Sequence, residues 1–314
     1  NNYIKKIFSL LLSIIIDNTN KMEENNNPLE MERQRATFPI QERNLLLNNN
    51  KTFPDRDKII KLLREDTALQ QLRDNEPFNN KTQNMKDMML KTKRIQEILA
   101  SDFPELRGSL ARLANKANLT YDYAFPPFNS TLLSAGGNGM FVNVIRSQMT
   151  PEQSKKWLLP AIKGEIWGTY AQTEMGHGSN VRGLETTGTY NPSTEEFIIH
   201  SPTLSSTKWW PAHLGFGCTH AVVYARLIVG DVDRGVVPFM VQLRDTKTYE
   251  PLPGVQLGTS GPTIGHYANE HGRCRFNNVR IPRDQLCMRW HQVSPDGTYF
   301  APKKEAKKTS YITM

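Results

Sequence analysis

Apolar residues recur every three to four positions in the first half of the chain, which is the spacing of one helix face. Three such stripes lie between residues 55 and 117: Ile59, Ile60, Leu62, Leu63 and Leu69; Met85, Met88, Met89, Ile95, Ile98 and Leu99; and Leu106, Leu110 and Leu113. Each stripe predicts one helix, the third spanning 103–117. We expect the methionines to fill the core between helices rather than to contact a cofactor.

A further helix is predicted to begin after Thr150. Thr150 can cap the helix, Pro151 suits its first turn, and Gln153 completes a capping box. We expect this helix to stop near Pro160.

The periodicity changes after Gly164 to short alternating or β-branched segments bounded by Gly, Pro and Asn. The expected strands cover residues 166–171, 185–190, 196–200, 221–229, 236–243 and 273–279. Several short strands separated by turn signals are typical of a barrel or sandwich. The predicted fold is therefore α+β, with a helical N-terminal domain at 55–164 followed by an antiparallel β-barrel domain at 165–290.

The two ends of the chain differ from its body. Residues 1–54 predict a disordered or irregular lead-in, because eleven of the first fifty residues are Asn. The apolar run 7–16 after Lys5 and Lys6 is too short to span a bilayer, which needs ~20 apolar residues. We interpret residues 1–21 as upstream sequence that is not native coding sequence, with Met22 as the start; a secretory signal is the alternative. No peroxisomal Ser-Lys-Leu-type signal ends the chain.

Charge and cysteine content narrow the classes of function. Lys and Arg total 39 against 31 Asp and Glu, a net charge of +8, which favours an anionic partner. Because no basic run is interleaved with aromatic residues, a phosphate-bearing small molecule is preferred over nucleic acid. Three widely spaced cysteines without a CxxC pair favour a reducing compartment and exclude a zinc-knuckle pattern.

Residues 168–179, read GTYAQTEMGHGS, are the strongest candidate for a binding segment. They predict a strand that runs into a glycine-punctuated loop carrying a hydroxyl, a carboxylate and an imidazole. Glycines allow close approach of the backbone to a ligand. The adjacent Trp209 and Trp210 predict a broad aromatic surface suited to a flat ring system.

These sequence motifs resemble those of peroxisomal acyl-CoA oxidases. The resemblance rests on residues 169–178, 182–187, 208–211, 251–254 and 295–299, which stand in the family's order. It covers the N-terminal and middle portion, most clearly 150–300. It implies an acyl-CoA dehydrogenase-like fold whose C-terminal helical bundle is missing here, with residues 291–314 as the start of a truncated helical region.

The resemblance implies an FAD-dependent enzyme of fatty-acid β-oxidation that converts acyl-CoA to trans-2-enoyl-CoA and reduces O2 to H2O2. It further implies a peroxisomal homodimer, with no nucleic-acid partner and no stable membrane insertion. Thr173 then bonds the flavin ring, Gly178 and Ser179 approach the pyrophosphate, and Trp210 lies against the isoalloxazine. No metal ligand is implied.

The residues themselves qualify this picture. Neighbouring strand positions face opposite sides, so only one of Trp209 and Trp210 can touch a cofactor. We expect a loop hydrogen bond from His177 and a structural role for Glu174. Ala212 stands where relatives carry a cofactor-contacting Gly, and it would weaken flavin binding if that turn needed positive φ.

No catalytic residue is assigned, because the resemblance places the Glu base in the C-terminal half that is not present. We therefore expect this chain alone to be inactive. The alternatives are an acyl-CoA dehydrogenase that uses an electron-transfer flavoprotein, an inactive truncated paralogue and a basic nucleic-acid binder.

Overall fold

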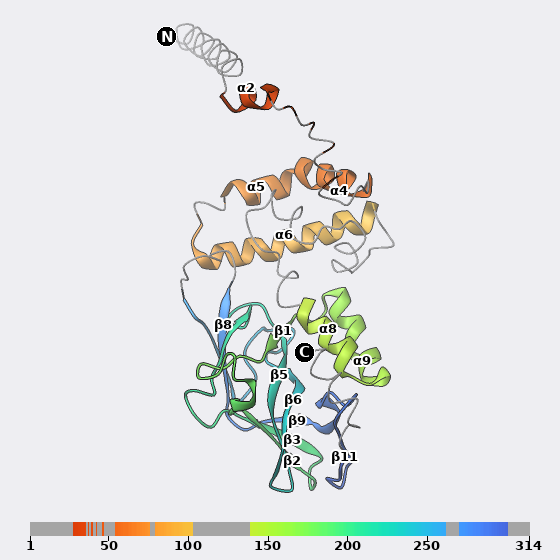
Figure 1. Ribbon diagram of the computed structural model, residues 1–314, viewed down its shortest axis with the longest axis vertical. Helices are drawn as coiled ribbons and strands as arrows, with labels where there is room; N and C mark the ends of the chain where they lie inside the picture. Colours follow the sequence, from red (N-terminus) through yellow and green to blue (C-terminus); the bar gives the residue numbers. More distant parts are fainter. Residues whose placement is uncertain are drawn as a thin grey trace. The chain divides into compact units, whose positions relative to one another are not determined.

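The computed structural model describes residues 28–35, 54–75, 79–102, 139–261 and 270–300, with a few single residues between 37 and 46 (Figure 1). The chain divides into two units, Asn1–Pro54 and Asp55–Met314. Helix α2 (Pro28–Arg35) lies in the first unit. The elements below belong to the second, with α4 beginning at its boundary.

The first apolar stripe forms two helices instead of one, α4 (Pro54–Glu65) and α5 (Thr67–Asn75). The break falls at Asp66, whose carboxylate accepts the backbone N–H of Leu69 at 3.0 Å and so starts a new helix. The Asp66 carboxylate also accepts a 2.7 Å hydrogen bond from Arg94 of helix α6 (Lys81–Asp102). Within α6, Met85 and Met88 are buried, as predicted. The helix expected at 103–117 lies outside the described residues.

Helices α8 (Gly139–Gln148) and α9 (Pro151–Lys163) follow. The capping box predicted for α9 is present, with hydrogen bonds in both directions between Thr150 and Gln153. The prediction that α9 stops near Pro160 is wrong. Pro160 lies inside the last turn, and the helix ends at Gly164, where φ is 73°, because glycine adopts this left-handed conformation without a Cβ penalty.

Eleven strands form three sheets over the described residues. The six-stranded sheet contains β1 (Gly168–Ala171), β2 (Thr187–Asn191), β3 (Glu196–His200), β5 (His220–Val229), β6 (Val232–Gln242) and β9 (Val279–Pro282). The three-stranded sheet has the order β4 (Lys208–Ala212), β8 (His271–Phe276) and β7 (Val255–Thr259). Strands β10 (Gln292–Val293) and β11 (Tyr299–Phe300) pair with each other.

The large sheet is mixed, which corrects the prediction of an antiparallel β-barrel. Strands β1 and β2 both pair with β5 in parallel, whereas β2–β3, β3–β9 and β5–β6 are antiparallel. Short alternating strands predict antiparallel hairpins, but the long connection from Ala171 to His220 supplies the crossover that parallel pairing requires. Residues 292–300, in the range expected to begin a helical region, form the β10–β11 pair instead.

Strand β5 is buried on both faces. Its Val223, Ala225 and Leu227 belong to the core between the sheets, whereas Val222 and Tyr224 pack with residues of α8 and α9. This explains its continuous apolar run. Figure 1 shows α8 and α9 beside β5 and β6.

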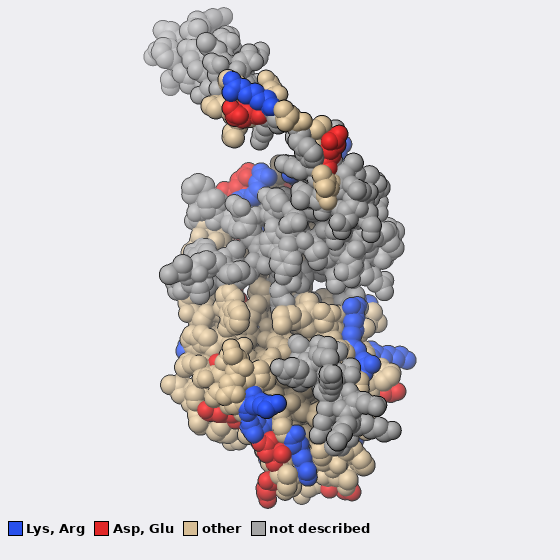
Figure 2. All heavy atoms as spheres, viewed as in Figure 1, with Lys and Arg blue, Asp and Glu red and all other residues tan. Residues whose placement is uncertain are grey.

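Charged residues of both signs lie on the outside of this unit (Figure 2). Several form exposed ion pairs, such as Lys156 with Asp284 and Arg280 with Glu196. Among the helices that the structure describes, none is both long and apolar enough to cross a membrane.

Candidate functional site

The candidate binding segment is a loop, residues 172–186, that leaves and re-enters the same edge of β5. Strand β1 ends with Ala171 opposite Val223, and β2 begins with Thr187 opposite Arg226. The two strands therefore use neighbouring stretches of one long partner, and the intervening loop projects from the sheet edge between them. We call this segment the β1–β2 loop.

Glu174 anchors the β1–β2 loop from within. Its side chain is fully buried, and its carboxylate accepts the backbone N–H groups of Glu185 at 2.8 Å and Thr186 at 2.9 Å. The Thr186 hydroxyl donates a further 2.6 Å bond. Burial raises the pKa of Glu174, but the charge of Lys208 and these hydrogen bonds together hold it below its ordinary value. The expected structural role of Glu174 agrees with this geometry.

Lys208, at the start of β4, is the partner that sequence reasoning missed. Its ammonium nitrogen lies 3.1 Å from Oε1 of Glu174 and donates to the carbonyls of Gln172 and Tyr224 at 3.0 and 2.7 Å. Burial lowers the pKa of Lys208 to about 8, against the opposing effect of Glu174. A lysine between Thr207 and Trp209 offers no sequence signal that it turns inward, because lysine is almost always exposed.

His177 lies between two carboxylates of the same loop. Its Nδ1 is 3.2 Å from Oε2 of Glu174, and its Nε2 is 3.8 Å from Oε1 of Glu185. The expected loop hydrogen bond is therefore present.

Thr173 and Trp210 are brought together through the backbone. The carbonyl of Thr173 accepts the N–H of Trp209 at 3.0 Å, so the loop and β4 run side by side. Trp209 is half-buried, whereas 63% of Trp210 is exposed. The register of β4 shifts between Trp209 and Ala212, and Trp210 has a φ of 85°. This strained backbone presents the indole outward.

Ala212 does not have the positive φ that would have made an alanine unfavourable in this turn. Among the described non-glycine residues, positive φ falls on Trp210 and His213 in this turn, and not on Ala212. The turn therefore places no left-handed conformation on the alanine.

The glycines of the segment serve different purposes. A Cβ at Gly168 would lie 2.1 Å from the ring of Phe141, and one at Gly176 would lie 2.8 Å from Ser205. These two glycines thus allow close packing within the protein. A Cβ at Gly178 would meet nothing within 4 Å, so only Gly178 faces open space.

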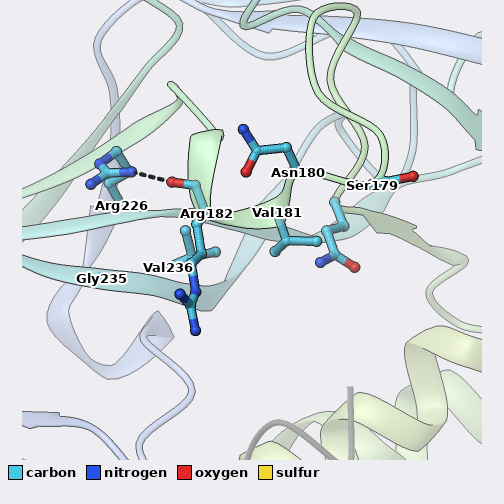
Figure 3. Close-up of a pocket in the computed structure, with 8 residues that line it drawn as sticks. Ser179, Asn180, Val181, Arg182, Arg226, Gly235 and Val236 are labelled. Carbon is cyan, nitrogen blue, oxygen red and sulfur yellow. Dashed lines mark hydrogen bonds between the residues drawn. The ribbon is translucent and has the colours of Figure 1, made fainter.

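A cleft of about 880 Å³ opens beside this loop (Figure 3). Its lining residues come from the loop and from the β5–β6 hairpin: Gln172, Ser179, Asn180, Val181, Arg182, Arg226, Gly235 and Val236. Of the predicted site residues, Ser179 lines this cleft. Thr173, Gly178, Trp210 and Ala212 lie outside its lining, in the loop and on β4.

Other buried titratable groups lie away from the cleft. The three cysteines are free and buried, and burial raises the pKa of each thiol. Burial lowers the pKa of His213 and of His220 to about 4. In the described part of the chain, no three His, Cys, Asp or Glu side chains gather as a metal site would require.

Comparison with known proteins gives consistent matches. A family model described as acyl-coenzyme A oxidase N-terminal matches residues 43–167. Peroxisomal acyl-coenzyme A oxidase 1 of Arabidopsis thaliana is 51% identical over 179 residues, covering 56% of this chain and 27% of that protein.

Solved structures agree with the sequence matches. Arabidopsis thaliana acyl-CoA oxidase 1 has a TM-score of 0.76 and 37% identity, covering 91% of this chain and 42% of that one. Acyl-CoA oxidase-2 of Caenorhabditis elegans, solved with FAD, ascaroside-CoA and ATP, has a TM-score of 0.73 and 34% identity over 92% of this chain and 42% of that one.

Helices followed by a mixed sheet, with the loop and tryptophan just described, are consistent with the acyl-CoA dehydrogenase-like class of fold. Within that class, the chain is similar to the N-terminal and middle portion of the acyl-CoA oxidases. It spans less than half the length of these relatives.

Proposed function

We propose that this chain is the flavin-facing part of an FAD-dependent acyl-CoA oxidase of peroxisomal fatty-acid β-oxidation. The observation that carries the proposal is the match at 51% identity to a protein named peroxisomal acyl-coenzyme A oxidase 1. A structural relative was solved with FAD and a CoA thioester, which supports the cofactor and the substrate class.

The residues present fit such a cofactor. Trp210 presents an exposed indole, Ser179 brings a hydroxyl to the cleft, and Gly178 leaves the backbone accessible. In the proposed arrangement Thr173 bonds the flavin ring, Trp210 covers it, Ser179 binds the pyrophosphate, and Ala212 offers its backbone. FAD when bound accepts two electrons from the substrate and delivers them to O2.

The reaction removes the α-proton and a β-hydride from acyl-CoA to leave trans-2-enoyl-CoA, while O2 takes two electrons and two protons to become H2O2. The protein must supply a base for the α-proton. Glu174 cannot serve, because its carboxylate is buried and bonded within the loop. The cleft lining within the described residues contains no carboxylate. We therefore propose that these 314 residues bind the cofactor without turnover. We propose separately, from the resemblance to acyl-CoA oxidases, that the full-length enzyme is a homodimer.

Flavin binding tests the proposal. The chain is titrated with FAD, and quenching of flavin fluorescence gives the affinity. Trp210→Ala should weaken binding by about tenfold, the scale of a well-placed aromatic contact, whereas Phe300→Ala, at another exposed aromatic residue, should leave it unchanged. Absence of FAD binding by the unaltered chain would refute the proposal.

Oxygen reactivity separates an oxidase from a dehydrogenase. In a longer protein that contains this chain, palmitoyl-CoA should yield peroxide at the rate of substrate oxidation. Reduction of the flavin by substrate without peroxide would favour the dehydrogenase. The relatives reported above are all named oxidases, which supports the first outcome.

A further inference from the structure

The cleft beside the β1–β2 loop contains two arginines in unequal situations. Arg226 is occupied: its guanidinium pairs with Asp233 and donates to the carbonyls of Arg182 and Leu184. The Arg226–Arg182 bond, drawn in Figure 3, fixes the backbone of the short helix η4 (Val181–Gly183) at the cleft wall.

The guanidinium of Arg182 has no such compensation. Arg182 is exposed and lines the cleft, and its side chain makes no hydrogen bond or ion pair within the described part of the chain. Its backbone carbonyl is held by Arg226, so an uncompensated guanidinium extends from an anchored point of the cleft wall.

Neutral donors accompany this charge. Oε1 of Gln172 accepts the hydroxyl of Tyr170 at 2.6 Å, which leaves the amide N–H groups of Gln172 as its remaining donors. Ser179 adds a hydroxyl to the same lining. A cleft with a guanidinium, an amide and a hydroxyl, and with no carboxylate among its described lining residues, is suited to a phosphate.

The wall is apolar beside the charge. Val181 and Val236 line the cleft and also pack against the buried cluster that contains Phe141 and Tyr224. A ligand with an anionic end and a less polar remainder matches a cleft that is charged at Arg182 and apolar at Val181 and Val236.

From these contacts we infer that the cleft binds a nucleotide phosphate and that Arg182 is its charged ligand. The identity of the nucleotide rests on the proposed function, which supplies two phosphate-bearing molecules, FAD and the CoA thioester. Arg182 acts in binding and takes no part in proton or electron transfer.

The test compares each nucleotide with its phosphate-free counterpart. Affinities of the 314-residue chain for FAD, riboflavin, coenzyme A and pantetheine are measured by calorimetry, with Arg182→Gln and Arg182→Lys beside the unaltered chain. Arg182→Gln should weaken FAD or coenzyme A by tenfold or more, as expected for loss of a charge-assisted hydrogen bond. Riboflavin and pantetheine should bind as before, and Arg182→Lys should recover part of the loss.

Arg234→Gln is the matched control, because Arg234 lies over the ring of Tyr299 and outside the cleft lining. It should leave all four affinities unchanged. A loss of affinity of Arg182→Gln for FAD would identify FAD as the source of the phosphate, and a loss for coenzyme A would identify coenzyme A.

Unchanged affinity of Arg182→Gln for both nucleotides would overturn the inference, as would equal losses in the Arg234 control. Since the side chain of Arg182 is exposed and makes no hydrogen bond within the described residues, its substitution should not lower the thermal midpoint. Failure of the chain to bind any flavin would refute the proposed function alone, because the coenzyme A arm still tests Arg182.

Discussion

Lys208 and Glu174 form an ion pair whose side chains are both fully buried, with 3.1 Å between Nζ and Oε1. The pair joins β4 to the β1–β2 loop. Lys208 also donates to backbone carbonyls of the loop and of β5, and Glu174 accepts backbone N–H groups at the far end of its own loop. Together with the backbone bond between Trp209 and Thr173, this buried pair holds together the segments that carry Trp210 and Thr173.

Removing one member of this pair should be costly. Lys208→Met leaves a buried carboxylate without its counter-charge, so we expect the free energy of unfolding to fall by about 3–5 kcal/mol. Urea denaturation measures it. Lys156→Met, which breaks the exposed pair with Asp284, should cost no more than about 1 kcal/mol.

The double variant Glu174→Gln/Lys208→Met should lose less stability than the sum of the two single changes, because each single change leaves a buried charge unpaired whereas the double variant removes both charges. Additive losses would show that the two side chains do not interact as described.

Acidification should destabilise the protein between about pH 6.5 and pH 4. The pKa values of His213 and His220 are lowered to about 4 by burial, so in this range the unfolded chain binds protons that the native protein does not. Each histidine should contribute a slope of up to about 1.4 kcal/mol per pH unit. The combined His213→Gln/His220→Gln variant should show a flatter profile of unfolding free energy against pH; an unchanged slope would contradict the prediction.

Gly168 should not tolerate a side chain. Gly168→Ala would place a methyl group 2.1 Å from the ring of Phe141, and overpacking of this kind costs about 1–3 kcal/mol. Gly178→Ala is the control, because its added methyl meets nothing within 4 Å. Thermal denaturation should separate the two variants, and Phe141→Leu should partly restore Gly168→Ala.

The cysteines should be unreactive in the native protein. All three are buried and burial raises the pKa of each thiol, so little thiolate forms and reagents cannot reach it. At pH 8 an aromatic disulfide reagent should label the three thiols only after denaturant is added. Rapid labelling of the native chain would place at least one thiol at the surface.

The sequence predicts local structure well where local chemistry decides it. The capping box at Thr150 and the buried Met85 and Met88 follow from residue type and spacing. The break at Asp66 and the extension of α9 past Pro160 depend on individual side-chain and backbone bonds. The parallel pairing of β1 and β2 with β5 depends on tertiary partners that alternation cannot reveal.

The candidate site divides in the same way. The motifs that contain Thr173, Ser179 and Trp210 can be recognised in the sequence. The buried contact of Lys208 with Glu174 and the unpaired guanidinium of Arg182 cannot. Burial and pairing of a charged residue are decided by its neighbours in space.

Strands β1 and β2 pair with the same edge of β5, so the sheet pairing does not depend on the exposed part of the loop between them. Both ends of the β1–β2 loop are held because β1 and β2 pair with adjacent stretches of β5. The exposed portion of the loop can therefore vary in length and sequence while the strands keep their register. Insertions or substitutions in this exposed portion should accordingly leave the sheet intact, provided that the buried pair of Glu174 and Lys208 is kept.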